Sequence, residues 1–113
     1  MSIVNSSKKL VDIAKTIRSK NAGVDKITFD IIFRDQADFD LVRNSGVLSR
    51  SSVARLYSIE EGRISDFVEF SPGLAIKFTF YRTRPSGSPG DPDIFGAQQY
   101  APLMDIEVPL PEE

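Results

Sequence analysis

The order of the predicted elements along this chain indicates an α+β fold that contains a split βαβ unit. Alternating apolar residues mark a strand at "KITFDIIFR", and two short capped segments with helical spacing follow it. A second pair of alternating segments, over residues 64–82, then predicts a hairpin. At 113 residues with 41% hydrophobic content, the chain is expected to form a single domain over residues 1–113.

The first predicted element is a helix of about four turns. Its apolar residues fall at i, i+3, i+4 and i+7, namely Leu10, Ile13, Ala14 and Ile17. Serines precede this segment as candidate caps, and Gly23 follows it as a stop signal. The alternation of Val11 with Ile13 leaves a strand open as the alternative over residues 9–20.

The segment "KITFDIIFR" is the clearest strand, because β-branched and aromatic residues dominate it. One face carries Ile27, Phe29, Ile31 and Phe33, which we expect to be buried beside a strand at Leu74 to Arg82. A helix capped by Asp35 and stopped by Gly46 is expected next. A second short helix follows in "SRSSVARLY", with a serine cap and with one side formed by Val53, Leu56 and Tyr57.

The hairpin consists of "ISDFVEF" and "LAIKFTFYR", joined by the turn "SPG". The second faces of the strands carry Ile32, Phe67 and Tyr81, so we expect uncovered apolar area and association with a partner or a second copy. The last strand is expected in "LMDIEV", with Met104, Ile106 and Val108 facing the core. This order is that of a ferredoxin-like split βαβ fold with a long irregular crossover, Arg82 to Pro102, before the last strand.

Composition excludes several functions. A net charge of −2 and a pI near 5.2 argue against nucleic acid binding. The absence of cysteine and histidine removes thiolate metal sites, cysteine nucleophiles and the usual imidazole base. The sequence shows no secretory signal and no run of about 20 apolar residues, so a cytoplasmic protein that does not enter the membrane is expected.

The glycine- and proline-rich crossover is the first candidate binding segment. Its glycines permit backbone amides to converge on an anion, and hydroxyls and amides follow nearby. The candidate residues are Ser86, Gly87, Ser88, Gly90, Asp91, Asp93, Gln98, Gln99 and Tyr100. On spacing alone, a plain surface turn is the favoured explanation of the segment. Because two carboxylates are too few for a hard cation, we expect no metal and no cofactor.

The segment "IRSKNAG" is the second candidate, with Arg18, Ser19, Lys20, Asn21 and Gly23 forming an anion- or amide-recognition corner. Cations that merely complement a helix end are the simpler explanation for it. Lys77 lies mid-strand and would be a base or nucleophile only if buried, whereas a position on the solvent face is commoner. Ser86 and Ser88 have no histidine to activate them.

Together, "IRSKNAG", "TFDIIF", "GVLSRSSVARLY", "LAIKFTF" and "SGSPGDPDIFGAQQYAPLMDIEVP" resemble a small domain family of unknown function that is associated with acyclic terpene utilisation protein A (AtuA). The layout is also similar to the carboxy-terminal ferredoxin-fold domain of AtuA-like proteins. The resemblance covers about Leu10 to Pro109. It departs at Val24, where many relatives have proline, and at Tyr100, where many have histidine.

The resemblance implies that Arg18 to Gly23 and Ser86 to Gln99 form a shared functional surface, and that the chain associates with an AtuA-type protein. The leading expectation is therefore an accessory or site-completing subunit in the breakdown of acids or acyl thioesters, with the polar loops meeting in one small-anion pocket. A free-standing module that binds a small anion or acyl-CoA is the alternative. An autonomous lyase or hydratase that uses Lys77 or Asp91 is a third. The chain is expected to act as a homo-oligomer or in a hetero-complex.

Overall fold

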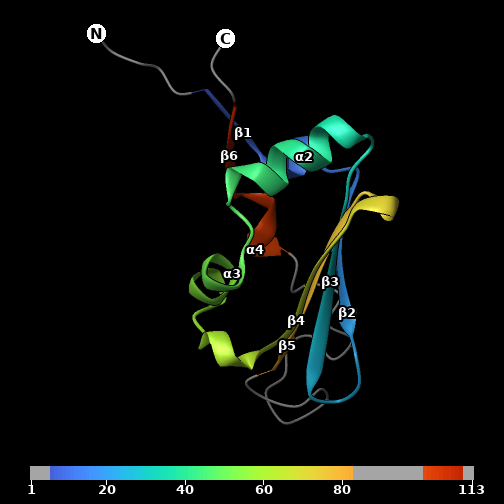
Figure 1. The fold of residues 1–113 in the computed structure, drawn as a ribbon. Coiled ribbons are helices and arrows are strands. Elements are labelled where there is room, and N and C mark those ends of the chain that lie inside the picture. The colour runs from blue at the N-terminus through green and yellow to red at the C-terminus, as the bar shows by residue number, and fades with distance from the viewer. Residues whose placement is uncertain (1–5, 83–100, 111–113) are drawn as a thin grey trace, which may run out of the picture.

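Helices pack against one side of an antiparallel sheet in the computed structural model, which describes residues 6–82 and 101–110 (Figure 1). This arrangement confirms the α+β fold class. In the described residues, a main sheet contains, in spatial order, β2 (Thr16–Asn21), β3 (Lys26–Ile32), β5 (Ala75–Tyr81) and β4 (Ile64–Phe70). Two helices, α2 (Gln36–Ser45) and α3 (Arg50–Tyr57), connect β3 to β4. Because β5 lies between these two strands, the predicted split βαβ unit is present.

The centre of the core is β3, as its alternating pattern predicts. Ile27, Phe29, Ile31 and Phe33 are all at most 2% exposed, and β3 pairs with β5 along its whole length. The Phe29 ring stacks on Phe78 at a centroid distance of 4.7 Å. This side of the sheet, which faces α2 and α3, is called the helix face below.

The first helix between β3 and β4 begins and ends, and the second begins, where the predicted capping residues lie. Asp35 accepts a hydrogen bond from the backbone N–H of Asp38 at 2.9 Å, and Gly46 takes a left-handed conformation with φ 77°. Ser49 forms a capping box with Ser52 at the start of α3. The expected apolar side of α3 is partly wrong. It buries Val53 and Ala54, whereas Leu56 is 37% exposed.

The expected helix from Leu10 to Gly23 is wrong beyond its first turn. Only α1 (Leu10–Ile13) is helical, and it buries Leu10 and Ile13. The chain then becomes β2, the strand that was kept open as the alternative. It pairs with β3 from Thr16↔Ile32 to Asn21↔Ile27. Six residues of this segment pair with β3, and an isolated helix would lack the contacts of these pairs. The segment therefore forms a strand although the spacing of its apolar residues is helical.

The last strand does not follow the prediction either. Ala101–Met104 form a helical turn, α4, and the strand β6 is limited to Glu107–Pro109. It pairs with β1 (Ser7–Lys9) in a separate two-stranded sheet. The buried apolar residues here are Leu103 and Val108, whereas Met104 and Ile106 are only partly buried. The edge of the main sheet beside β3 is instead occupied by β2.

The hairpin of β4 and β5 is present, with η1 (Glu61–Arg63) before it and η2 (Ser71–Gly73) as its turn. An irregularity between Ile64 and Asp66 shifts the register by one residue. Phe67 therefore lies opposite Phe78 on the helix face, with the two rings stacked at 6.1 Å. The expected position of Phe67 on the second face is wrong for this reason, whereas Ile32 and Tyr81 do lie there.

Tyr57 closes the aromatic core at the end of α3. Its ring lies 5.3 Å from that of Phe29 and 5.1 Å from that of Phe80. Burial raises the pKa of Tyr57 well above its usual range, because the ionised phenolate would lose its hydration.

We expect this packing to make the fold sensitive to alkali. The unfolded phenol ionises near pH 10 while the folded one stays neutral, so the stability it supports is complete below about pH 10 and is lost as pH rises further. The free energy of unfolding should fall by up to about 1.4 kcal/mol per pH unit above that point. Urea denaturation of wild type and Tyr57→Phe at pH 9 and pH 11 measures this contribution. Equal losses in both proteins would contradict it.

Candidate functional site

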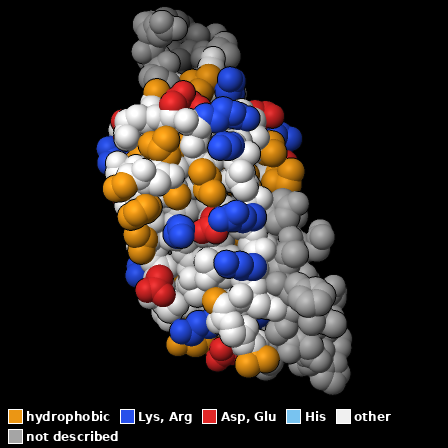
Figure 2. All heavy atoms as spheres, turned by 90° about the vertical axis from the view of Figure 1, so that its right-hand side faces the viewer, with side chains coloured by type: hydrophobic (Ala, Val, Ile, Leu, Met, Phe, Trp, Pro, Cys, Tyr) orange, Lys and Arg blue, Asp and Glu red, His pale blue; other side chains and the backbone are white. Residues whose placement is uncertain are grey.

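The side of the main sheet that faces away from α2 and α3 is the candidate site, and it is called the open face below. Figure 2 views the molecule from this side, and cationic side chains run through its centre while apolar side chains gather along one edge. The strand register places three cross-strand rows here. They are Lys20–Thr28–Thr79–Asp66, Arg18–Asp30–Lys77–Val68 and Thr16–Ile32–Ala75–Phe70.

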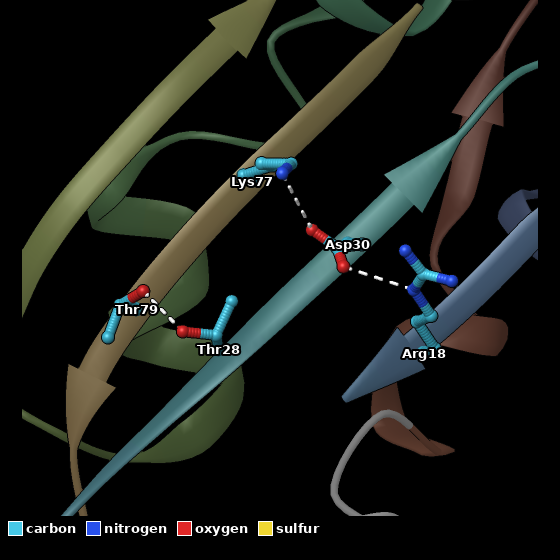
Figure 3. A network of polar contacts seen from close by, with 5 residues as sticks. All are labelled: Arg18, Thr28, Asp30, Lys77 and Thr79. Atoms are coloured by element: carbon cyan, nitrogen blue, oxygen red, sulfur yellow. Dashed lines mark hydrogen bonds and ion pairs between the residues drawn. The ribbon is translucent and has the colours of Figure 1, made fainter. Parts of the chain in front are cut away.

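The middle row contains a buried carboxylate between two cations (Figure 3). The side chain of Asp30 is only 6% exposed. Its Oδ2 accepts a hydrogen bond from Arg18 Nε at 3.0 Å, and Lys77 Nζ lies 3.7 Å from its Oδ1. The second distance allows an ion pair but exceeds hydrogen-bond length, so no described residue donates a hydrogen bond to Oδ1. Asp30 is therefore held between its neighbours while one buried oxygen lacks a donor.

Beside this row, two threonines connect the central strands. Thr28 Oγ1 and Thr79 Oγ1 are 2.8 Å apart and share a hydrogen bond (Figure 3). Lys26 places its ammonium group 4.9 Å from the centre of the Tyr81 ring, at the end of the same strands. Lys20 makes no ion pair or hydrogen bond with a described residue.

The face carries more positive than negative charge. Strand positions on it hold four cations, Arg18, Lys20, Lys26 and Lys77, against two carboxylates, Asp30 and Asp66. The whole chain, in contrast, has a net charge of −2. The open face therefore carries a local excess of positive charge on a chain whose net charge is negative.

The predicted corner at Arg18 to Gly23 is divided between the two faces of the sheet. Arg18 and Lys20 point to the open face, because β2 is a strand. Ser19 is buried opposite Phe29, and Asn21 is partly buried on the same side. Gly23 lies in the turn with φ 91°. The explanation of the cations by a helix end is wrong, since no helix ends here.

The corner is joined to the end of β5. Asn21 Oδ1 accepts a hydrogen bond from Arg82 Nη1 at 2.8 Å. The backbone N–H of Arg82 donates to the backbone carbonyl of Asp25 at 2.7 Å. Arg63 also donates to the carbonyls of Tyr81 and Arg82. Arg82, the last described residue before the glycine- and proline-rich segment, therefore lies directly beside the corner.

The other predicted site residues are Ser86, Gly87, Ser88, Gly90, Asp91, Asp93, Gln98, Gln99 and Tyr100. They lie outside the described residues, as does the expected pocket between them and the corner. Lys77 is not the buried amine that a catalytic base would require, because its side chain is 52% exposed.

Asp30 was not among the site residues predicted from the sequence, although the sequence contains a signal for it. An acidic residue interrupts the apolar run "TFDIIF", and Lys77 interrupts "AIKFTF" at an outward position in the same way. Two opposite charges at outward positions of two apolar strands are typical of a cross-strand pair.

Two cavities lined by described residues lie away from the open face. One, of about 490 Å³, lies between α2 and β6, and the other, of about 470 Å³, lies at the start of α3. The described residues contain no cluster of three or more acidic side chains that could hold a metal ion. None of the described helices has the length and apolar character needed to cross a bilayer.

These features define a small α+β domain with one sheet face covered by helices and the other presenting charged and apolar side chains. A family model matches residues 10–107 of the chain, and it is that of DUF4387, a domain of unknown function. The chain belongs to this family. No curated protein and no solved structure matches the chain.

Proposed function

We propose that this domain is an accessory subunit that docks on a larger protein through its open face. The partner is an AtuA-type protein that acts in the breakdown of acids or acyl thioesters, including those from acyclic terpenes, in the cytoplasm. Support for this partner comes from the resemblance of the polar motifs. Support for a docking role comes from the surface itself.

The observation that carries the proposal is the exposed apolar area on the open face. Val68 and Phe70 are 48% and 49% exposed, and Tyr81 is 40% exposed. Val68 and Phe70 are neighbouring outward positions of β4, and Tyr81 lies outward at the far end of β5. Large exposed apolar side chains on one face beside charged groups are typical of a protein-interaction surface.

The charge of the face favours a different partner over a second copy of the chain. Face-to-face pairing of two copies would bring Arg18, Lys20 and Lys77 of each copy toward the same cations of the other. A partner surface with exposed carboxylates avoids this repulsion. The hetero-complex is therefore our proposal, and self-association is an outcome that sedimentation analysis can detect.

A second candidate function is a free-standing module for a small anion or an acyl-CoA. Arg18 and Lys20 support it, because both have donors that no described residue uses. The bond between Asn21 and Arg82 adds to this support, because it joins the corner to the start of the predicted crossover. An autonomous lyase is the weakest candidate, since Lys77 is exposed and already lies beside Asp30.

The test is co-purification of the chain with a tagged AtuA-type protein, followed by titration calorimetry. Val68→Glu and Phe70→Glu should each weaken the complex by at least about tenfold, because a buried apolar contact becomes a buried charge. Leu56→Glu is the matched control, since Leu56 is also half-exposed but lies on α3. Absence of a complex would refute the proposed partner. A complex that all three variants weaken equally, or not at all, would refute the proposed face.

A further inference from the structure

We infer that Arg18, held in position by Asp30 and flanked by Lys77 and Lys20, is a binding site for a carboxylate group. The inference rests on the proposed role of the open face as a binding surface, and it specifies the chemistry of what binds there. Arg18 is the residue that binds, and Asp30 is the residue that positions it.

Asp30 restricts Arg18 without using its whole guanidinium group. The hydrogen bond to Asp30 Oδ2 uses Nε only, at 3.0 Å. Both terminal amino groups therefore remain as donors, and no described residue accepts a hydrogen bond from them. The side chain of Arg18 is 59% exposed, so a ligand can reach these groups. A guanidinium that is fixed at one nitrogen binds a planar anion with less loss of side-chain entropy.

The flanking lysines add charge and further donors. Lys77 makes an ion pair with Asp30 at 3.7 Å but no hydrogen bond, so its donors remain available to another acceptor. Lys20 follows Arg18 by two positions on the same strand and therefore lies on the same face. Two cations contact the carboxylate of Asp30, and a third, Lys20, lies in the neighbouring row opposite Thr28, so the cluster has excess positive charge.

The planar donors of Arg18 favour a carboxylate. A doubly charged anion would be repelled by Asp30 more strongly than a carboxylate, but the cations of the cluster would also attract it more strongly, so charge does not distinguish the two. A carboxylate has the planar two-oxygen geometry that matches the two terminal amino groups of Arg18. It is therefore the anion whose shape fits these donors.

The direct test is nuclear magnetic resonance of the Arg18 Nε–H group during titration with sodium acetate. Sodium chloride at the same ionic strength is the reference. We expect a saturable shift with acetate that chloride does not reproduce. Arg18→Lys, followed through the backbone amide of Ser19 because the variant lacks the Nε–H group, should weaken acetate binding by about fivefold, since it keeps the charge but loses the two-donor geometry. The same amide is followed in the wild type for comparison. Arg55→Lys on α3 is the matched control and should leave the binding of acetate unchanged.

One further measurement separates a site from a change in folding. Lys20→Gln leaves the Arg18–Asp30 bond intact and should weaken acetate binding about twofold without lowering the melting temperature. The inference is overturned if acetate and chloride shift the signal equally, or if Arg18→Lys binds acetate as well as wild type does.

A competition experiment distinguishes a carboxylate on the partner protein from a free small carboxylate. If acetate displaces the AtuA-type protein and Arg18→Lys weakens that complex, the carboxylate is an acidic side chain of the partner. If the complex forms but is insensitive to both, the cluster binds a free small carboxylate. Failure of any complex to form refutes the proposed function alone, because the acetate titration is performed on the isolated chain.

Discussion

Replacing Phe29 by alanine is expected to destabilise the protein by about 3–5 kcal/mol, the usual cost of deleting a fully buried aromatic side chain. Phe29 is 0% exposed and lies at the centre of the sheet. Its ring contacts Phe78, Phe80 and Tyr57 at centroid distances of 4.7, 5.2 and 5.3 Å. The substitution therefore removes transfer free energy and also leaves a cavity beneath α3. The midpoint of urea denaturation, measured at constant m-value, reports the loss.

Phe70→Ala is the matched control, because it deletes the same side chain at a position that is 49% exposed. The expected cost is below about 1 kcal/mol, since half of that surface is already in contact with water. A cost for Phe29→Ala no greater than that for Phe70→Ala would show that β3 is not the centre of the core.

Removal of both cations beside Asp30 should have the second-largest effect. Asp30 is only 6% exposed, and in Arg18→Met combined with Lys77→Met its carboxylate loses its hydrogen bond and both of its ion pairs. An uncompensated buried charge costs about 3–5 kcal/mol. Because the two cationic side chains are 59% and 52% exposed, water enters easily, and we expect a loss of about 2 kcal/mol.

Addition of Asp30→Asn to that double variant should recover most of the stability, since the amide is neutral and its burial costs much less than that of a charge. Urea denaturation of the wild type, the double variant and the triple variant at pH 7 tests the cycle. If the double variant is as stable as wild type, the two cations do not compensate the charge of Asp30. That result would also remove the proposed reason for the orientation of Arg18.

Local patterns in the sequence predict the central elements because those elements carry their own signals. The alternation in "TFDIIF" defines β3 and its buried side chains. Asp35, Gly46 and Ser49 mark the ends of α2 and α3 by capping, which depends on adjacent residues only. The same holds for the β4–β5 hairpin, whose turn lies within one short segment.

Residues 10–21 show where local spacing is insufficient. Leu10, Ile13 and Ala14 are buried in or directly after one helical turn, as their spacing predicts. Ile17 continues the same spacing but belongs to β2, because the edge of β3 offers backbone hydrogen bonds to this segment. A similar limit applies to Phe67, whose face is reversed by the irregular register at Ser65.

The sequence by itself determined the α+β class, the central strand and both ends of α2, since each depends on neighbouring residues. Only the tertiary structure decided what the cations in "IRSKNAG" face. Arg18, Asp30 and Lys77 are separated by 12 and 47 positions along the chain, and the order β2–β3–β5 brings them into one row. Strand order depends on which edges pair, and that is settled by the burial of the whole core rather than by any local signal.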